Sequence, residues 1–270
     1  MGNEFELIAG FLLEKNIAKP QIGIILGSGL GALVDKIEVE TEILYSEIPG
    51  FPVSTVEGHA GKLIFGTIAS KKVVVMQGRF HYYEGYNMDQ IVLPIKVMKV
   101  LGIGYLFVSN ASGGLNPTYR TGDLMVITDH INFFPINPLR GANNDKYGPR
   151  FPDMGNVYDK KLIDKACAIA KAESIPLQKG IYIGSSGPTL ETPAEYRMFR
   201  ILGADATGMS TVPEVIVAHH MGIKIFGISI ITNESESAAE IATTHHDVQI
   251  NAAKAEPRMT VLFEKLIESL

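Results

Sequence analysis

Residues 22–31 read IGIILGSGLG, a five-residue apolar run followed by three closely spaced glycines. The apolar run predicts a buried strand, and the glycines predict a tight turn after it. Before the strand, residues 4–16 carry apolar side chains at helical spacing, and Pro20 closes that segment. A helix, a buried strand and a glycine-rich turn in this order indicate an α/β protein.

The same alternation continues along the chain. Further apolar runs predict strands over residues 63–65, 73–76, 105–108, 124–127, 180–183 and 225–231. Helical spacing predicts helices over residues 87–101, 160–173, 193–202, 212–220 and 248–270, the last with an interruption at Pro257. This alternation predicts an α/β fold with a mostly parallel or mixed central sheet. Because no biased linker and no internal repeat divides the sequence, we expect residues 1–270 to form one domain.

Composition excludes several functional classes. The formal net charge is −5 and no long Lys/Arg run occurs, so the attraction that nucleic-acid binding relies on has no visible source. The apolar runs are too short to span a bilayer, which excludes a membrane partner. The N-terminal segment carries Glu4, Glu6 and Glu14 instead of the basic start of a signal peptide. The single cysteine, Cys167, lies in an alanine-rich helical stretch and is expected to pack internally, so a cytoplasmic location is predicted.

The glycine-rich turn at 27–31 is the first candidate binding element. Glycines let backbone amides approach an anion closely, and the hydroxyl of Ser28 adds a donor. The glycine spacing differs from a dinucleotide fingerprint, and no Gly-Lys-Ser/Thr follows as in a Walker A loop. A turn without any ligand is the alternative interpretation.

The second candidate element is QGRFHYYEG, residues 77–85, which follows a predicted buried strand. In an extended segment, Arg79, His81 and Tyr83 project to the same side. A guanidinium, an imidazole and a phenol together suit an oxyanion such as phosphate. The alternative is a surface Arg–Glu pair with aromatic rings packed beside it.

Small residues follow the next strand, in SNASGGLN at 109–116, and predict a ligand-binding loop or a simple tight turn. Glu191 stands just before Pro193, which begins a predicted helix, so its carboxylate faces either a ligand or the helix dipole. Ser210 can donate a hydroxyl to an anion, with Met209 as an adaptable apolar wall.

Asn233 ends the last predicted strand and offers both a donor and an acceptor, which fits the edge of a heterocycle. His245 and His246 are adjacent, but no second pair at a suitable spacing supports a metal site. The histidines at 219–220 are interpreted as structural or surface residues. Neither a metal nor an organic cofactor is therefore predicted.

Seven segments in order carry a family resemblance. They are GSGLG, EGHAGKL, QGRFHYYEGY, NASGGLNP, DHINFFPINPLRG, GPTLETPAEYR and GADATGMSTVPEVIVA. Together they resemble the trimeric, low-molecular-mass class of the purine nucleoside phosphorylase and methylthioadenosine phosphorylase family, from about Gly23 to the C-terminus. The resemblance implies an α/β fold with a central mixed sheet flanked by helices, assembled as a homotrimer. It also implies phosphorolysis of 6-oxopurine nucleosides such as inosine and guanosine, with inorganic phosphate as co-substrate and no cofactor.

The resemblance also implies residue roles. Phosphate would be bound by Ser28, His59, Arg79, His81, the Ala111 backbone and Ser210. The nucleoside would be bound by Tyr83, Leu190, Glu191, Met209, Asn233 and His245, with Phe151 reaching in from a neighbouring subunit. The implied catalytic residues are Glu191, Asn233 and His81. Leu190 stands where many relatives carry Phe, and either His245 or His246 would face the ribose 5′-hydroxyl.

Three alternative functions are weighed against this one. A methylthioadenosine phosphorylase has the same fold but prefers a 6-aminopurine, a preference that an Asp in place of Asn233 would suit better. A purine or phosphate sensor could keep the pocket without catalysis. A Rossmann dehydrogenase is disfavoured by the glycine spacing.

Overall fold

The computed structural model describes residues 4–15, 17–27, 31–53, 60–234 and 244–270. Its strands are β1 (Ile22–Leu26), β2 (Glu38–Leu44), β3 (Lys62–Ile68), β4 (Lys71–Gln77), β5 (Tyr105–Gly114), β6 (Leu124–Asn132), β7 (Leu177–Gly184), β8 (Ala206–Gly208) and β9 (Lys224–Glu234). Its α-helices are α1 (Glu4–Leu13), α2 (Met88–Leu101), α3 (Lys160–Ala172), α4 (Pro193–Ile201), α5 (Val212–His220) and α6 (His245–Glu268). Short 3₁₀ helices are η1 (Ala32–Lys36), η2 (Tyr45–Glu47) and η3 (Tyr82–Glu84).

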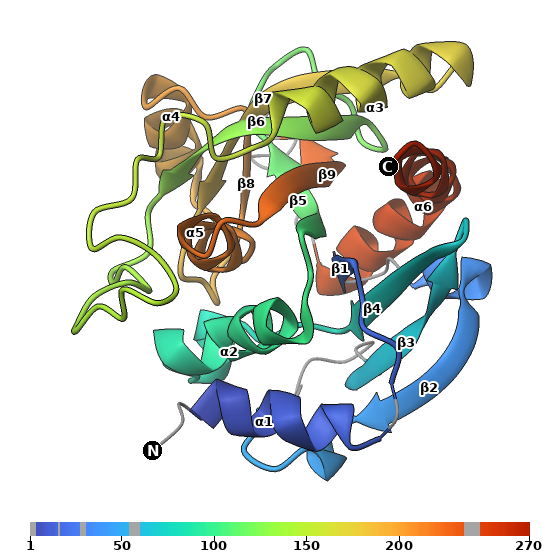
Figure 1. Ribbon diagram of the computed structural model, residues 1–270. Coiled ribbons are helices and arrows are strands. Elements are labelled where there is room, and N and C mark those ends of the chain that lie inside the picture. Colours follow the sequence, from blue (N-terminus) through green and yellow to red (C-terminus); the bar gives the residue numbers. More distant parts are fainter. Residues whose placement is uncertain (1–3, 16, 28–30, 54–59, 235–243) are drawn as a thin grey trace.

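The strands form one mixed sheet in the order β2-β3-β4-β1-β5-β8-β7-β6-β9 (Figure 1). β5 pairs in parallel with β1 and β9 and antiparallel with β8. Because β8 pairs with β7, β7 with β6, and β6 with β9, these five strands close on themselves. We call β5, β8, β7, β6 and β9 the strand ring. The predicted α/β fold with a central mixed sheet is confirmed.

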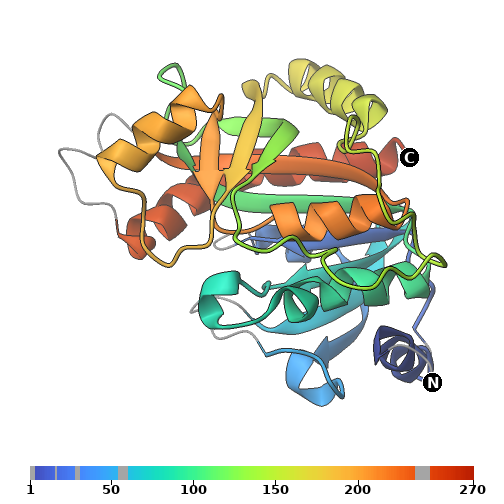
Figure 2. The ribbon, with the colours of Figure 1, turned by 90° about the vertical axis from the view of Figure 1, so that its left-hand side faces the viewer.

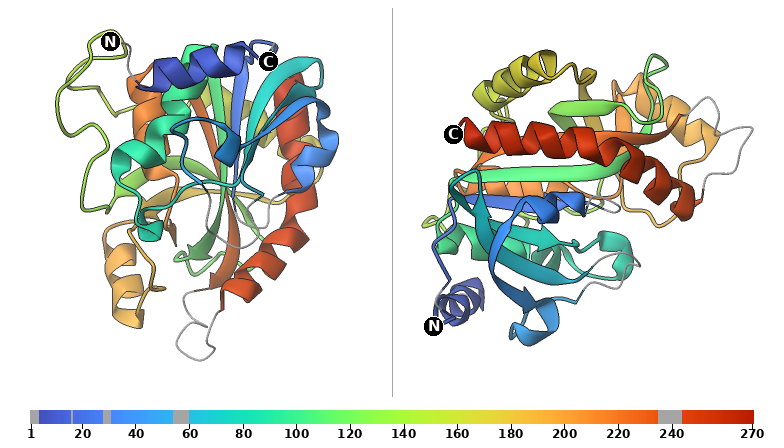
Figure 3. Two further views of the ribbon diagram at one scale, coloured as in Figure 1. Left: turned by 90° about the horizontal axis from the view of Figure 1, so that it is seen from below. Right: turned by 90° about the vertical axis from the view of Figure 1, so that its right-hand side faces the viewer.

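Helices cover the sheet on two sides. α2 contacts both α1 and α5 on one side, while α3 and α6 contact each other on the opposite side (Figures 1 and 3). α4 lies at the same end of the sheet as the start of α6 (Figures 2 and 3). Across the residues described, none of the helices combines the length and the apolar character needed to cross a membrane.

Burial explains which strands the sequence predicts. All five residues of β1 are buried, as are nearly all of those in the central part of β9, so both read as continuous apolar runs. β2 lies at the sheet edge, and only Ile43 in its sequence EVETEIL is buried. β8 has three residues, ATG. Apolar patterning therefore missed both β2 and β8.

Two sequence predictions about the ends of strands and helices are wrong. Residues 109–114 continue strand β5 instead of forming a loop, because they pair in parallel with β9. Side-chain hydrogen bonds satisfy the small polar residues there: Ser109 Oγ donates to Ile25 O at 3.2 Å, and Ser112 Oγ to Asn110 Oδ1 at 2.6 Å. The other wrong prediction is the interruption of the last helix at Pro257.

Helix α6 runs for 24 residues through Pro257 without the predicted interruption. A proline inside a helix costs about 3 kcal/mol and loses one backbone hydrogen bond. Apolar residues on both sides of the proline are fully buried, namely Ala252, Ala255, Met259 and Leu262. Their packing offsets the local cost, since tertiary contacts override helix propensity.

Candidate active site

A cavity of about 530 Å³ opens where the ends of several strands meet. β5, β8 and β9 supply part of its lining, and the segments that follow β1 and β4 supply more. Ligands of open α/β sheets bind at such strand ends, because loops and exposed backbone amides gather there. We call this cavity the main cavity.

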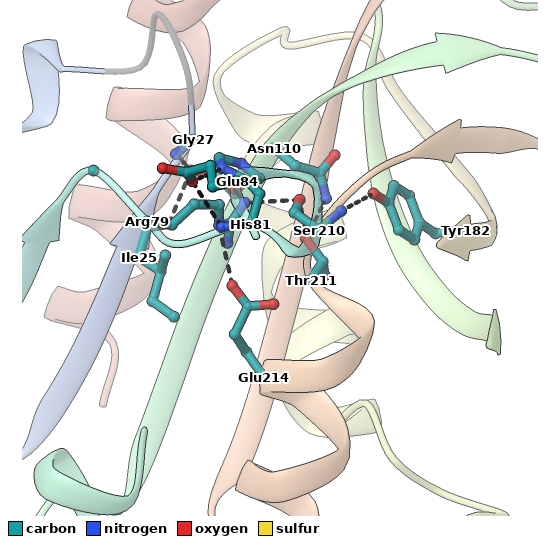
Figure 4. A network of polar contacts seen from close by, with 12 residues as sticks. Ile25, Gly27, Arg79, His81, Glu84, Asn110, Tyr182, Ser210, Thr211 and Glu214 are labelled. Atoms are coloured by element: carbon teal, nitrogen blue, oxygen red, sulfur yellow. Dashed lines mark hydrogen bonds and ion pairs between the residues drawn. The ribbon is translucent and has the colours of Figure 1, made fainter. Parts of the chain in front are cut away.

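Arg79 forms the charged side of the main cavity and is only 2% exposed (Figure 4). Its Nε donates to Glu214 Oε1 at 3.1 Å, and Glu214 on α5 is itself buried. Its Nη1 donates to Ser109 O at 2.8 Å and to Ser210 Oγ at 3.0 Å. A guanidinium held by a carboxylate, a carbonyl and a hydroxyl is fixed in orientation before any ligand arrives.

Ser210 is held from two further directions. Its backbone N–H points to Tyr182 Oη at 3.4 Å, and its hydroxyl lies 3.1 Å from Thr211 Oγ1. Asn110 Nδ2 in turn donates to Thr211 Oγ1 at 2.9 Å. Buried polar groups linked in this way define one arrangement of the cavity wall (Figure 4).

His81 lines the main cavity beside Arg79. Its Nδ1 contacts Glu84 Oε1 at 2.8 Å, and its ring stacks on Tyr83 with centroids 4.6 Å apart. Burial lowers the pKa of His81, although the hydrogen bond that its ring makes to the Glu84 carboxylate acts in the opposite direction. In the neutral ring, Nδ1–H donates to the carboxylate, which leaves Nε2 as the acceptor.

The segment around His81 differs from the extended geometry expected from the sequence. Tyr82, Tyr83 and Glu84 form the 3₁₀ turn η3, and Gly85 ends it with a φ of 92°, a value that favours glycine. Arg79, His81 and Tyr83 nevertheless all line the main cavity. Arg79 pairs with the buried Glu214, so the alternative of a surface Arg–Glu pair is wrong.

Glu191 forms the acidic side of the main cavity and immediately precedes helix α4. Thr192 caps that helix and Pro193 occupies its first turn, as the sequence predicts. Thr207 Oγ1 on β8 donates to Glu191 Oε1 at 2.7 Å. Burial raises the pKa of the Glu191 carboxyl, while hydrogen bonds from Thr207 and Tyr196 act to lower it.

Asn233 stands near the end of β9, beside Glu191 in the same cavity. Its Oδ1 accepts from Thr232 Oγ1 at 3.3 Å. Its Nδ2 donates to Tyr196 Oη at 3.4 Å. The two hydroxyl contacts hold the plane of the amide in one position on the cavity wall.

The main cavity brings together most of the predicted site residues. They are Arg79, His81, Tyr83, Ala111, Leu190, Glu191, Met209, Ser210 and Asn233. Ser28 and His59 lie outside the described residues. His245 begins α6, with its side chain outside the described part, and Val248 one turn later lines the cavity.

Phe151 does not line the main cavity. Its ring is 86% exposed and borders a second cavity of about 550 Å³, together with His130, Arg140 and Arg150. Such an exposed aromatic ring on an irregular segment is available to another surface.

Sequence reasoning gave no role to four residues of the cavity wall and to one supporting residue. They are Glu84, Tyr196, Thr207 and Val248, with Glu214 behind Arg79. Glu214 had a visible signal, since it is the single charged residue in the apolar helix segment VPEVIVA. An acidic residue among apolar ones is rarely buried without a partner. Within the described ranges, the structure holds no group of three or more His, Cys, Asp or Glu side chains arranged to bind a metal.

Known proteins are similar to this chain in both sequence and fold. The family model described as "Phosphorylase superfamily" matches residues 21–268. Purine nucleoside phosphorylase 1 of Bacillus subtilis is 52% identical over 248 residues, covering 92% of this chain and 92% of that protein. Structures of the Schistosoma mansoni purine nucleoside phosphorylase in complex with adenosine and with inosine superpose with TM-scores of 0.92 and 0.91. They are 42% and 40% identical, and each alignment covers 98% of this chain and 96% of the other.

The match extends over nearly the whole chain in both sequence and structure, and the strand ends that line the main cavity fall inside it. The chain therefore belongs to the purine nucleoside phosphorylases of the phosphorylase superfamily.

Proposed function

We propose that the main cavity catalyses phosphorolysis of 6-oxopurine nucleosides, such as inosine and guanosine, to the free purine and ribose 1-phosphate. One observation carries the proposal: a single cavity is lined by a buried guanidinium hydrogen-bonded to a hydroxyl, and also by a carboxylate and an amide. The first pair suits phosphate, and the second suits a purine edge.

Phosphate would bind to Arg79 and Ser210, with His81 and the backbone of Ala111 completing the described part of its site. Arg79 is already oriented by Glu214 and Ser109 O, so little ordering remains when the anion binds. Ser28 and His59 stay predictions for the same subsite. Tyr83 and Met209 would line the ribose.

The reaction forms one bond and breaks one. A phosphate oxygen bonds to C1′ while the bond from C1′ to N9 breaks, and the bonding electrons leave with the purine. Charge at C1′ resembles that in glycoside cleavage, where an oxocarbenium-like centre is stabilised by a nearby anion. Attack from the face opposite the base inverts the configuration at C1′.

The departing purine gains negative charge, which a hydrogen bond from Asn233 Nδ2 to N7 would stabilise. Glu191, as a carboxylate, would accept the N1–H of a 6-oxopurine. A 6-aminopurine has no proton on N1, so the same carboxylate would face a lone pair. The Schistosoma structures contain either adenosine or inosine, so the preference for a 6-oxopurine rests on Glu191 and Asn233.

We further propose that residues 1–270 work as one domain within a homotrimer. The main core cluster includes buried residues from α1 at one end of the chain to α6 at the other, which supports one folding unit. The exposed ring of Phe151 would complete the cavity of a neighbouring subunit. The cytoplasmic location expected from the sequence stays a prediction.

Release of hypoxanthine from inosine, with and without inorganic phosphate, tests this function. Adenosine and methylthioadenosine run alongside. Cleavage of inosine only when phosphate is present is expected. Phosphate-independent cleavage would mean a hydrolase, preference for methylthioadenosine would favour the related phosphorylase, and no cleavage would indicate a binding protein.

Glu191→Ala tests the residue assignment. We expect nearly complete loss of activity on inosine with phosphate binding retained, because the base loses its acceptor. Glu195→Gln is the matched control, since a glutamine at this position still accepts the N–H of Thr192 in the helix cap. Full activity of Glu191→Ala would remove Glu191 from its proposed role.

A further inference from the structure

Tyr196 joins the main cavity to the core of the protein. Its ring is 5% exposed and packs in a small apolar cluster with Leu115, Ile183, Phe199 and Ala204. Its hydroxyl end reaches the cavity lining. The ring of Tyr196 therefore has a structural role, and its hydroxyl belongs to the site.

Helix geometry brings Tyr196 to Glu191. With Thr192 as the N-cap of α4, Glu191 precedes the cap and Tyr196 is the fourth helical residue. Side chains at these two positions meet at helix N-termini, where they commonly form an apolar contact. Here both side chains line the main cavity, and donation by the tyrosine hydroxyl acts to lower the pKa of the Glu191 carboxyl.

The Tyr196 hydroxyl also contacts Asn233. Asn233 Nδ2 lies 3.4 Å from Tyr196 Oη and donates to it. Since a phenol has one proton, the hydroxyl can accept from Asn233 and donate to Glu191 at the same time. Donated hydrogen bonds thus run in one direction, from Asn233 through Tyr196 to Glu191.

A threonine hydroxyl lies at each end of this chain of hydrogen bonds. Thr232 Oγ1 donates to Asn233 Oδ1 at 3.3 Å, and Thr207 Oγ1 donates to Glu191 Oε1 at 2.7 Å. Every contact in the chain fits Asn233 with Nδ2 on the Tyr196 side and Glu191 as an acceptor. With the amide reversed, the tyrosine would have to donate to Asn233 Oδ1, and its single proton would no longer be available to Glu191.

We propose that Tyr196 is a positioning residue for base recognition, which orients the Asn233 amide and keeps Glu191 an acceptor, and thereby selects 6-oxopurines. The inference deepens the proposed function and rests on it. Tyr196 acts through Asn233 and Glu191.

The surroundings of Glu191 determine how strongly the Tyr196 hydroxyl affects the pKa of the Glu191 carboxyl. Burial raises the pKa of the Glu191 carboxyl, and the nearby carboxylate of Glu195 acts in the same direction. The hydroxyls of Thr207 and Tyr196 oppose this effect by donating to the charged form. Without the Tyr196 hydroxyl, the carboxyl should take up a proton at higher pH and then present a donor to the N1–H of the base.

Tyr196→Phe tests the proposal because it keeps the ring in its cluster and removes only the hydroxyl. The kcat/KM for inosine should fall about tenfold, the effect of losing one hydrogen bond to a charged group. The acid limb of the pH profile should move to higher pH, and the KM for phosphate should stay unchanged. The preference for inosine over adenosine should shrink.

Tyr119→Phe is the matched control. Tyr119 is similarly buried, its hydroxyl donates to Lys179 O at 2.8 Å, and it does not line the main cavity. This variant loses a buried hydroxyl far from the base, so its pH profile should superpose on that of the wild-type protein. Equal shifts in both variants would mean a general effect of stability and would overturn the proposal.

A readout independent of turnover completes the test. The Glu191 carboxyl is titrated by ¹³C NMR in the wild-type protein and in Tyr196→Phe, with Glu191→Gln used to assign the signal. A higher pKa in Tyr196→Phe supports the contact, and an unchanged pKa overturns it. If the wild-type protein fails to cleave inosine with phosphate, the proposed function is wrong, whereas the titration still decides the role of Tyr196.

Discussion

Replacing Glu214 by alanine should leave the buried charge of Arg79 without its carboxylate. Arg79 is 2% exposed, so water cannot take over the lost hydrogen bond at Nε. Removing one partner of a buried ion pair lowers the free energy of unfolding by about 3–5 kcal/mol. Glu214→Gln keeps an acceptor for Nε–H and should lose less.

The expected change in melting temperature follows from chain length. The entropy of unfolding is about 2.1 cal/mol/K per residue, or about 0.57 kcal/mol/K for 270 residues. Glu214→Ala should therefore melt about 5–9 °C below the wild-type protein in scanning calorimetry. Added inorganic phosphate should raise the melting temperature more in the variant than in the wild type, because the anion supplies a charge for Arg79.

A surface pair provides the control. Glu42 pairs with Lys62 at 2.8 Å and is 43% exposed, so Glu42→Ala should cost less than about 1 kcal/mol. If Glu214→Ala is no less stable than Glu42→Ala, the buried pair does not hold Arg79 as described. An equal response of variant and wild type to phosphate would separate Arg79 from the phosphate subsite.

Two further predictions concern Phe151 and His130. Phe151→Ala should leave the free energy of unfolding within about 0.5 kcal/mol of the wild type, because the ring is 86% exposed, but raise the KM for inosine in the assembled protein; an unchanged KM would separate Phe151 from the neighbouring site. Burial lowers the pKa of His130 from 6.5 to about 4, so the folded protein resists protonation that the unfolded chain accepts. Stability should fall by up to about 3 kcal/mol as the pH drops from 6.5 to 4, and His130→Gln should show a flatter dependence in urea unfolding; parallel curves would count against His130.

The sequence predicts the parts of the fold that are buried on both faces. β1 and β9 read as apolar runs because helices cover both sides of them. The edge strand β2 shows no such run, since most of its side chains face water. In β5, residues 109–114 resemble a loop because polar groups such as the Ser109 hydroxyl and the Asn110 amide are satisfied by neighbours distant in the sequence.

In the candidate site, too, the sequence predicts some features and not others. Arg79, Glu191 and Asn233 were predictable because each stands where a strand or helix ends, the place where ligands bind. Their supporting contacts were not. The bond from Arg79 to Glu214 spans 135 residues and that from Asn233 to Tyr196 spans 37, so no local pattern indicates either one.

The strand ring limits how such an enzyme can change over time. A strand inside a closed ring cannot slide along its neighbour unless the next strand follows, and a one-residue slip would also turn each side chain to the opposite face. Inherited insertions and deletions beside the base should therefore collect in the segment 185–192, which carries Leu190 and Glu191 and lies between β7 and α4. In a laboratory library, insertions should be tolerated there far more often than within residues 229–233 of β9.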